Sequence, residues 1–219
     1  MKPPPSAVAE SATAPSRTRR EEILDEAMAL FAERGYEGTS MSELAERVGL
    51  RKASLFHHFA SKEVLYAAVL ARLVEEVASA ITGSAFLPGT FAERLDTLCD
   101  AITSVLGQQP FAARLLIREV MDWGPVVREH LADKIMLSLA ASEAFIVAGQ
   151  AEGSFVQTDV RHLIITLTGL HFMPFAIGGI VKGFVGADPS VPAFIEPRRE
   201  AVKDHVRRLM LSAREYTRR

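Results

Sequence analysis

Residues 47–62 read RVGLRKASLFHHFASK, and this stretch decides both the fold of the N-terminal part and the surface that it presents. It contains four Lys or Arg residues, two His residues and no acidic residue. Leu55 and Phe59 form the apolar face of a short helix over Lys52–Phe59, and Gly49 supplies the turn that precedes it. A helix of about eight residues is unstable alone in water and must pack on neighbours. Its polar and basic side chains then face outward, as in a recognition helix that fits the major groove.

The segments around this stretch predict more helices. Arg19–Arg34 has apolar residues at helical spacing and is stopped by Gly35. Ser40-Met41-Ser42-Glu43 has the pattern of a capping box at the start of the next short helix. Ser61 is a good N-cap for a long helix over Lys62–Ile81. Residues 17–62 are therefore predicted to form a helix-turn-helix domain.

The rest of the chain, residues 63–219, is also predicted to be helical and to form the larger domain. Thr90-Phe91-Ala92-Glu93 is a second capping box, and Pro110 and Pro125 suit the first turns of helices. The predicted helices cover about 90–106, 110–122, 125–152, 159–182 and 197–214. No strand-like alternation extends beyond a few residues, so the fold class is all-α, with about nine helices.

Residues 1–16 are rich in Pro, Ser, Ala and Thr and are predicted to be a flexible arm. They contain no apolar core of a signal peptide, so we expect the protein to reside in the cytoplasm.

The amino-acid composition restricts the range of possible functions. The 219 residues are 48% hydrophobic and 24% charged, which is typical of a globular protein. The net charge of −2 argues against a generic nucleic-acid binder. Basic and acidic residues number 9 and 9 in residues 1–62, 8 and 15 in 63–196, and 8 and 3 in 197–219. No nucleophile–base pair or metal-ligand spacing stands out, so we predict no enzyme, no catalytic residue, no metal and no cofactor.

The N-terminal sequence resembles the TetR family of transcriptional regulators. The resemblance spans about residues 19–70 and rests on ILDEAMALFAERGYEGTSMSELAERVGLRKASLFHHFASKEVLYAAVL, which begins at Ile23. It implies a three-helix DNA-binding head, a fourth helix as connector, and a helical body for dimerisation and ligand binding. Residues 83–219 match the family only in the number and lengths of their helices, and they indicate no particular ligand.

The predicted DNA contacts lie in and around the short basic helix. We expect Lys52, His58 and Lys62 to hold phosphates, and Arg51, Ser54 and His57 to reach base edges. Further candidates at this surface are Thr39 and Ser40, which could donate to phosphate, together with Ala53 and Phe56.

Two positions depart from the usual family pattern. Arg51 stands where a small N-cap such as Ser is common, and this poor cap costs about 1 kcal/mol. Its guanidinium could instead fork onto a guanine or a phosphate. Phe56 stands where Tyr is common, so a phosphate hydrogen bond is lost and apolar contact, for example with a thymine methyl, remains.

Other interpretations of these residues are simpler. The basic helix could be a solvated surface. His57 and His58 could suggest a metal site, but adjacent side chains on a helix diverge by about 100° and do not readily share an ion. The single cysteine, Cys99, excludes a disulfide framework and is expected to be a small core residue rather than a redox site.

The segment Leu163–Val181 has no formal charge over 19 residues, which approaches the length of a membrane span. His171, Pro174 and several Gly and Thr residues weaken a lipid-facing helix. The basic tail that follows also resists translocation. We therefore expect a buried bundle helix and no membrane segment.

The tail helix carries an apolar stripe of Val202, Val206, Leu209 and Ala213, with Met210 beside it. The stripe could pack on its own subunit. The resemblance implies instead a four-helix dimer interface made by the last two long helices of each subunit, with the tail Arg residues as a solvated face.

A ligand pocket is predicted in the body, because 163–181 is more apolar than the packing of a small bundle requires. An apolar cavity with a few polar anchors is the usual form of a small-molecule site. The acidic excess of the body suits a neutral or cationic lipophilic effector. His171 could equally be a core histidine. The candidate lining residues are Phe111, Leu115, Trp123, Phe145, His171 and Phe175.

Together these features predict a homodimeric repressor that binds a palindromic double-stranded DNA operator and is released by a small lipophilic effector. The alternative is an interaction protein of the same fold that acts on a non-transcriptional partner, with DNA only as a locator. Release of DNA by metabolites would distinguish the two.

Overall fold

The computed structural model describes residues 18–216. In that range the chain forms eleven α-helices, one π-helical segment and no strand, so the predicted all-α class is confirmed. The predicted flexible arm, residues 1–16, lies outside the described residues. The helices are α1 (Arg19–Gly38), α2 (Met41–Arg47), α3 (Lys52–His58), α4 (Lys62–Ala85), α5 (Phe91–Gln108), α6 (Pro110–Asp122), η1 (Val127–Leu131, π-helical), α7 (Ala132–Glu152), α8 (Val160–Ala176), α9 (Gly178–Val185), α10 (Pro192–Met210) and α11 (Ala213–Tyr216).

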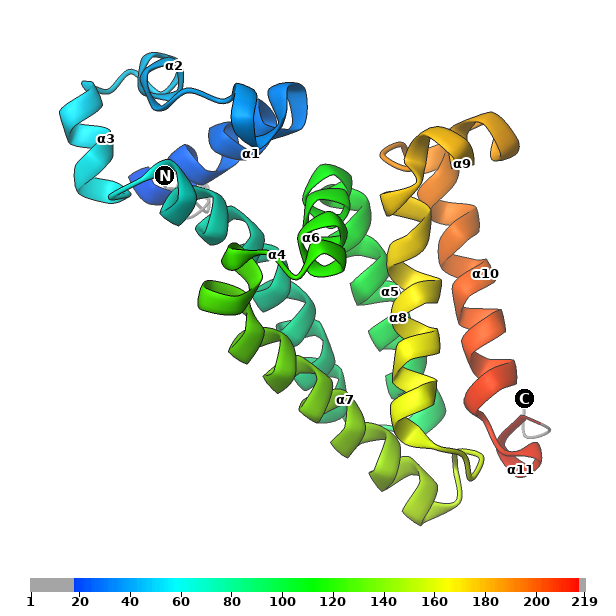
Figure 1. Ribbon diagram of the computed structural model, residues 1–219. Helices are drawn as coiled ribbons and strands as arrows, with labels where there is room; N and C mark the ends of the chain where they lie inside the picture. The colour runs from blue at the N-terminus through cyan, green and yellow to red at the C-terminus, as the bar shows by residue number, and fades with distance from the viewer. Residues whose placement is uncertain (1–17, 217–219) are drawn as a thin grey trace, which may run out of the picture.

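The first three helices form a separate lobe, the head, at one end of the molecule (Figure 1). Its core contains Phe31 of α1, Leu44 of α2 and Leu55 of α3, all essentially inaccessible to solvent. Gly35 interrupts α1 with a φ of 70°, a left-handed conformation that glycine adopts without strain. The predicted stop at this residue is therefore a break in the helix, after which Tyr36–Gly38 add a last turn.

The turn between α2 and α3 is a Schellman motif. Gly49, at a φ of 63°, donates its N–H to the Glu46 carbonyl, and the Leu50 N–H reaches the Ala45 carbonyl at 2.8 Å. These two bonds satisfy carbonyls that the end of α2 would otherwise leave unpaired. The motif fixes the direction in which α3 leaves α2, and so the orientation of the outward face of α3.

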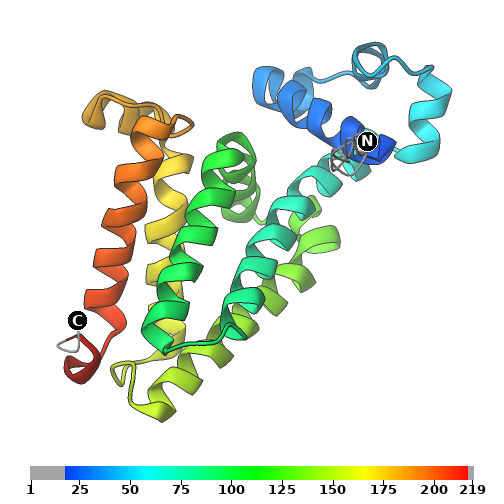
Figure 2. The same cartoon turned by 180° about the vertical axis from the view of Figure 1, so that it is seen from behind.

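Helix α4 runs from the head into the second lobe, the body (Figures 1 and 2). Ser61 caps its start by accepting from the Val64 N–H at 3.1 Å, as the sequence predicts. Leu65 and Leu70 pack in the core shared with the head, and Val77 and Ile81 face the body. One helix thus belongs to both lobes, and it ends four residues later than predicted.

The body is a bundle of α4 to α10. Two groups of buried residues fill it: one continues from the head through α4 and α6, and the other joins α5, α7, α8 and α10. At the far end, the rings of Phe91, Phe145 and Phe155 lie 5.3–5.6 Å apart. The predicted capping box at Thr90 and Glu93 begins α5 as expected.

Three further helices differ from the prediction at their boundaries. The helix predicted for 125–152 includes the π-helical segment Val127–Leu131 before α7. The helix predicted for 159–182 ends at Ala176, just after Pro174, and continues as α9 after a bend of 80°. The last long helix begins at Pro192 rather than Pro197 and ends at Met210.

The bend also bears on the membrane question. Within residues 18–216 no single helix is long and apolar enough to cross a membrane. Only α8 and α9 together, across the bend, are long and apolar enough.

Candidate nucleic-acid interface and ligand cavity

Helix α3 presents the candidate DNA-binding surface on the side of the head that lies farthest from α10 in both views (Figures 1 and 2). Arg51, Lys52, His57 and His58 are exposed, while Leu55 anchors the helix in the core. Within residues 18–216, no acidic side chain pairs with any of these four basic groups. Such charges are available to phosphates and to base edges.

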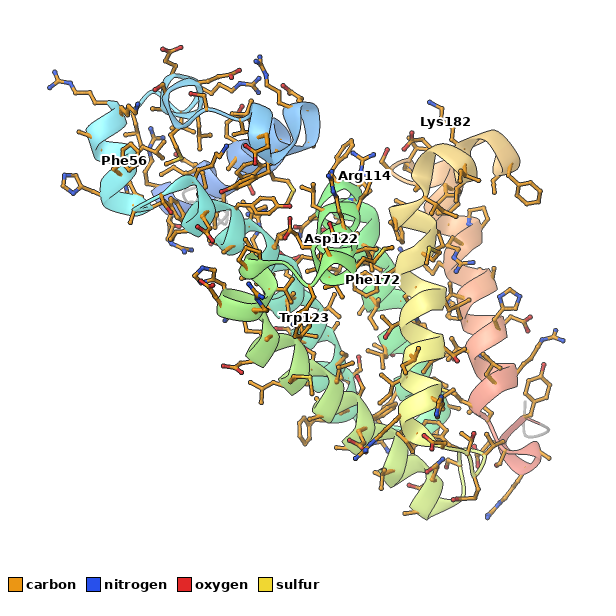
Figure 3. The ribbon with its side chains drawn as sticks, viewed as in Figure 1. Phe56, Arg114, Asp122, Trp123, Phe172 and Lys182 are labelled. Atoms are coloured by element: carbon orange, nitrogen blue, oxygen red, sulfur yellow. The ribbon has the colours of Figure 1, made fainter. Side chains whose placement is uncertain are left out.

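The other predicted residues of α3 are placed less uniformly. Ala53 is exposed, Ser54 is half-buried and Phe56 is 39% exposed. Phe56 is labelled on α3 in Figure 3. An exposed phenyl ring on this face suits apolar contact with a base methyl group. Arg51 is the N-cap and makes no capping hydrogen bond, as the sequence predicts, so its guanidinium is not used inside the head.

Arg47, the first residue of the basic stretch, does not belong to this surface. Its guanidinium forms ion pairs with Glu33 at 2.8 Å, Glu26 at 3.2 Å and Glu43 at 3.4 Å. The hydrogen bonds to Glu33 and Glu26 raise the pKa of Arg47 above its usual range. Arg47 therefore ties α2 to α1 and contributes no free charge.

Thr39 was predicted to donate to phosphate, and the structure corrects this. Its side chain is 4% exposed, and its hydroxyl donates to the Gly35 carbonyl at 2.8 Å. Ser40 is exposed at the start of α2, where its oxygen accepts from the Ser42 N–H. Its own proton remains available. The predicted capping box is incomplete, because Glu43 pairs with Arg34 and Arg47.

Lys62 holds the head together at the start of α4. Its ammonium donates to the Tyr36 carbonyl at 2.9 Å and lies 4.4 Å from the centre of the Tyr36 ring. These contacts join the start of α4 to the end of α1, which gives Lys62 a structural role that sequence reasoning missed. Arg20, which was not predicted, is exposed and lies over the Phe59 ring at 5.0 Å, next to the end of α3.

The body contains a cavity of about 200 Å³ between its two groups of buried residues. Eighteen of its 23 lining residues are apolar, and none carries a formal charge. It is lined by Val74, Val77 and Ile81 of α4; Leu95, Leu98, Cys99 and Ile102 of α5; Leu116, Ile117 and Val120 of α6; Ile135, Ser138, Leu139, Ser142, Phe145 and Ile146 of α7; Ile164, Leu167, Thr168, His171 and Phe172 of α8; and Val206 and Met210 of α10.

Two of the six predicted pocket residues, Phe145 and His171, line this cavity. The other four do not. Leu115 is buried in the core, and Phe175 packs against Phe194 at 6.2 Å between ring centres.

Phe111 and Trp123 are exposed and lie outside the cavity. Trp123 is 57% exposed at the corner where α6 ends, whereas Phe172, on α8, does line the cavity (Figure 3). The sequence identifies these residues as aromatic but does not say which face of a helix meets the cavity.

His171 is the polar group of the cavity wall with the most constrained chemistry. Its Nδ1 lies 2.8 Å from the Leu167 carbonyl oxygen, which can only accept, so Nδ1 carries the proton. Nε2 is then a lone-pair acceptor, and it is enclosed without a hydrogen-bond partner in the described structure. Burial lowers the pKa of His171, which favours this neutral form.

Cys99 is confirmed as a buried residue of the core, and it also forms part of the cavity wall. Burial raises the pKa of its thiol to about 12. The thiol therefore stays protonated at neutral pH, and a buried thiol of this kind is unreactive.

Helix α6 connects the cavity to the head. Its residues Leu116, Ile117 and Val120 line the cavity. The neighbouring Glu119 accepts a hydrogen bond at 3.2 Å from the hydroxyl of Tyr66, a buried residue of α4. The Tyr66 ring in turn packs at 4.9 Å against Phe31 and Tyr36 of α1. The sequence alone gives no sign of this link between residues 53 positions apart.

The residues of the tail stripe divide between the two alternatives. Val202, Val206 and Met210 are buried in their own subunit against α5 and α8, whereas Leu209, 45% exposed, and Ala213 are exposed. The tail Arg residues are not all solvated either. Arg207 forms a bidentate pair with Asp96 of α5, with N–O distances of 2.6 and 2.7 Å.

Potential metal ligands can also be located in the described structure. His57 and His58 form no group of potential ligands with other described residues. The one group of suitable size in residues 18–216 consists of Glu63, Glu129 and His130, which lie at or near the surface with ligand atoms within 4.8 Å of one another. Exposed acidic groups often gather in this way without an ion.

Comparison with known proteins supports the geometry of the head. The family model described as "Bacterial regulatory proteins, tetR family" matches residues 23–69, which include α2, α3 and the start of α4. The biofilm operon icaADBC HTH-type negative transcriptional regulator IcaR of Staphylococcus aureus is 45% identical over 47 residues, which cover 22% of this chain and 25% of IcaR.

The similarity extends into the body in other proteins. The HTH-type transcriptional regulator RutR of Escherichia coli is 26% identical over 162 residues, or 72% of this chain and 75% of RutR. A crystal structure of AibR in complex with isovaleryl coenzyme A and operator DNA superposes with a TM-score of 0.67 and 19% identity, covering 86% of this chain and 97% of AibR. At that identity the likeness establishes the fold alone.

Proposed function

Because this chain belongs to the TetR family of bacterial regulatory proteins, we propose that it represses transcription by binding an operator as a homodimer and leaves it when a small lipophilic molecule occupies the cavity. The observation that carries this proposal is the outward face of α3, where Arg51, Lys52, His57 and His58 are exposed without acidic partners among the described residues. The related regulator IcaR is named as a negative regulator, which supports repression.

We propose different DNA contacts for the individual residues of the interface. Lys52, in the first turn of α3, Ser40, the N-cap of α2, and His58, at the other end of α3, are proposed to bind phosphates. Arg51, Ser54 and His57 are proposed to reach base edges, and Phe56 to make apolar contact. The buried hydroxyl of Thr39 is not among the proposed phosphate contacts, and the contacts of Lys62 with Tyr36 give Lys62 a mainly structural role.

The proposed homodimer uses the outer face of α8, α9 and α10. Ile165 and Met173 of α8, Ile180 and Phe184 of α9, and Leu209 of α10 are between 45% and 91% exposed. Exposed apolar side chains in such number mark an interaction surface. A two-fold dimer would place two copies of α3 against successive half-sites of a palindromic operator in the cytoplasm.

Release is proposed to act through α6. A molecule that fills the cavity contacts Ile117 and Val120, and Glu119 between them on the same helix bonds to Tyr66 beneath the head. Movement of α6 would then change the position of α4 and the spacing of the two heads. If the effector lowers the affinity for the operator, operator binding must lower the affinity for the effector by the same factor.

The first prediction tests the interface by the salt dependence of DNA binding. Operator sequences are first selected from random duplex DNA, and affinity is measured by fluorescence anisotropy over a range of salt concentrations. Lys52→Ala should weaken binding to all sequences and reduce the salt slope by about one, because one fewer counterion is released. Arg51→Ala should relax specificity at a single base pair.

Lys134→Ala is the matched control, because it removes an exposed positive charge from α7, outside both the head and the proposed dimer face. Its salt slope should equal that of the wild type. If Lys52→Ala and Arg51→Ala both leave affinity, slope and sequence preference unchanged, α3 is not the recognition helix.

A further inference from the structure

Three polar side chains of the cavity wall offer hydrogen-bond acceptors, and no lining residue is charged; Thr168, the other lining residue with a hydroxyl, lies at the exposed rim. Ser138 donates its hydroxyl proton to the Lys134 carbonyl at 2.9 Å, and Ser142 donates to the Ser138 carbonyl at 3.0 Å. His171 donates from Nδ1 to the Leu167 carbonyl. Each of these side chains therefore donates its proton to a carbonyl of its own helix, and only a lone pair remains to accept a hydrogen bond from a ligand.

The acceptor of greatest consequence is Nε2 of His171, which is enclosed and has no partner among the described residues. A buried polar atom without a hydrogen bond is destabilising, and native proteins rarely leave one unsatisfied. Arg198 acts on this ring electrostatically, and its Nη2 is bonded to the Leu170 carbonyl. Its Nε is also enclosed without a partner, and no hydrogen bond joins Arg198 to Nε2 of His171 in the described structure. A group that satisfies Nε2 must bring its own proton.

The uncharged lining and the volume of the cavity further restrict the class of ligand that it can hold. An ionised group is costly to bury without a partner, and no Lys, Arg, Asp or Glu lines the cavity. An apolar cavity of about 150 Å³ in a protein can hold benzene. A cavity of about 200 Å³ has room for a substituted single ring or a branched chain of similar bulk.

From these observations we propose that the cavity binds a neutral, largely apolar molecule of about one ring, with a hydroxyl group that donates a hydrogen bond to Nε2 of His171. This assignment of ligand class rests on the proposed function, because it concerns the effector site of that function. It excludes carboxylates, phosphate esters and quaternary ammonium ions as occupants of the cavity.

The test uses three probes on the same ring, with the full-length protein. The probes are 4-propylphenol, which donates a hydrogen bond; 1-methyl-4-propylbenzene, which has a methyl group in place of the hydroxyl; and 4-propylbenzoate, an anion at pH 7.5. Dissociation constants are measured by isothermal titration calorimetry for the wild type and for His171→Phe, a variant that replaces the acceptor by an apolar ring.

The decisive quantity is the ratio of the dissociation constants of the two neutral probes. The probes differ in hydrophobicity, and this difference cancels when the ratio is compared between the wild type and the variant. The preference for the phenol should fall roughly threefold to tenfold in His171→Phe, the range expected for one hydrogen bond. Thr166→Val removes an exposed hydroxyl from the same helix at a position that does not line the cavity, and it should leave the ratio unchanged. The benzoate should bind more weakly than either neutral probe to the wild type.

A second readout covers the case in which His171→Phe does not fold, as judged by circular dichroism. In wild-type protein labelled with ¹⁵N-histidine, the phenol should shift the unprotonated nitrogen of the buried imidazole, and the methyl analogue should not. An unchanged ratio in folded His171→Phe, an unchanged nitrogen shift, or benzoate binding as tight as phenol binding would overturn the proposal.

Operator release is measured separately with the same probes. If the phenol binds with the expected dependence on His171 but never releases the operator, the ligand class stands and the proposed effector function fails. If a probe releases the operator with no dependence on His171, the effector function stands and the assignment of the ligand class fails.

Discussion

At the scale of single residues, the imidazole of His171 has the clearest physical consequences. The ring is buried, its Nδ1 proton is held by the Leu167 carbonyl, and a positive charge on it would face Arg198 without a counterion. Burial therefore lowers its pKa below the ordinary value of 6.5. The unfolded chain binds a proton on this residue at a pH where the folded chain does not.

This difference predicts a pH dependence of stability. As pH falls below 6.5, protonation of the unfolded chain should reduce the free energy of unfolding, by at most about 1.4 kcal/mol per pH unit for this one group. His171→Phe should remove this contribution. Urea unfolding of both proteins at pH 7.5 and 5.5 measures it. Equal losses of stability in the two proteins would show that His171 titrates normally.

Thr39 and Ser40 show the limit of sequence reasoning about a site. Both are hydroxyl residues before a helix, and the local pattern treats them alike. Their environments differ because Gly35 turns the end of α1 back over Thr39, whose hydroxyl then bonds to the Gly35 carbonyl. Which of two adjacent hydroxyls faces solvent depends on this tertiary arrangement, whereas the exposed charges of α3 follow from its short apolar face alone.

At the scale of the helices, the sequence predicts the helix N-termini that have strong local caps. It does not predict the boundaries and breaks that depend on tertiary packing. Ser61 and Thr90 each accept from a backbone N–H group of the first turn, as expected. Asp159, predicted only as the approximate start of α8, caps that helix in the same way. Pro192 and Pro197 both suit a first turn, and the sequence cannot tell which one begins α10. Nor does it reveal the π-helical segment before α7, because that segment depends on how its residues pack against α4.

The contact between α7 and the segment that follows it depends on a glycine. A Cβ atom added to Gly149 would lie 2.2 Å from the ring of Phe155, so the helix backbone approaches this ring more closely than any side chain allows. Gly149→Ala should lower the free energy of unfolding by about 1–3 kcal/mol through overpacking.

Gly83→Ala provides the control, because a Cβ atom there meets nothing within 4 Å. Within α4 it should be neutral or stabilising by up to about 1 kcal/mol, since alanine favours helix over glycine. Denaturant unfolding distinguishes the two variants. If Gly149→Ala is as stable as the wild type, Phe155 can move away from α7 at little cost.

At the scale of the whole molecule, the proposed dimer must cover the apolar face of α8, α9 and α10. Phe184 is 91% exposed and Ile180 70% exposed, and no other part of the described chain covers them. Most of the stripe predicted for this purpose on α10 is buried within its own subunit. The exposed apolar surface available for dimer formation therefore lies mainly on α8 and α9.

Leu209→Glu should prevent dimer formation, because it would bury an unpaired carboxylate in the proposed interface. Light scattering should show a monomer, and affinity for the palindromic operator should fall by about 10²-fold or more as two linked contacts become one. Leu137→Glu is the control, because this residue is 71% exposed on α7, outside that face. A Leu209→Glu protein that remains dimeric would place the interface elsewhere.

The adjacency of Glu119 and Val120 on α6 has a consequence for how sensitively such a regulator responds. Suppose that Val120 contacts the effector and that Glu119 holds α6 beneath the head. The operator-bound protein then binds the effector more weakly than the free protein does, by the same factor by which the effector weakens operator binding. The dose of effector needed for half-maximal response then rises with the fraction of protein bound to DNA. Gene dosage of the operator would set the threshold of the switch, with no change in either binding site.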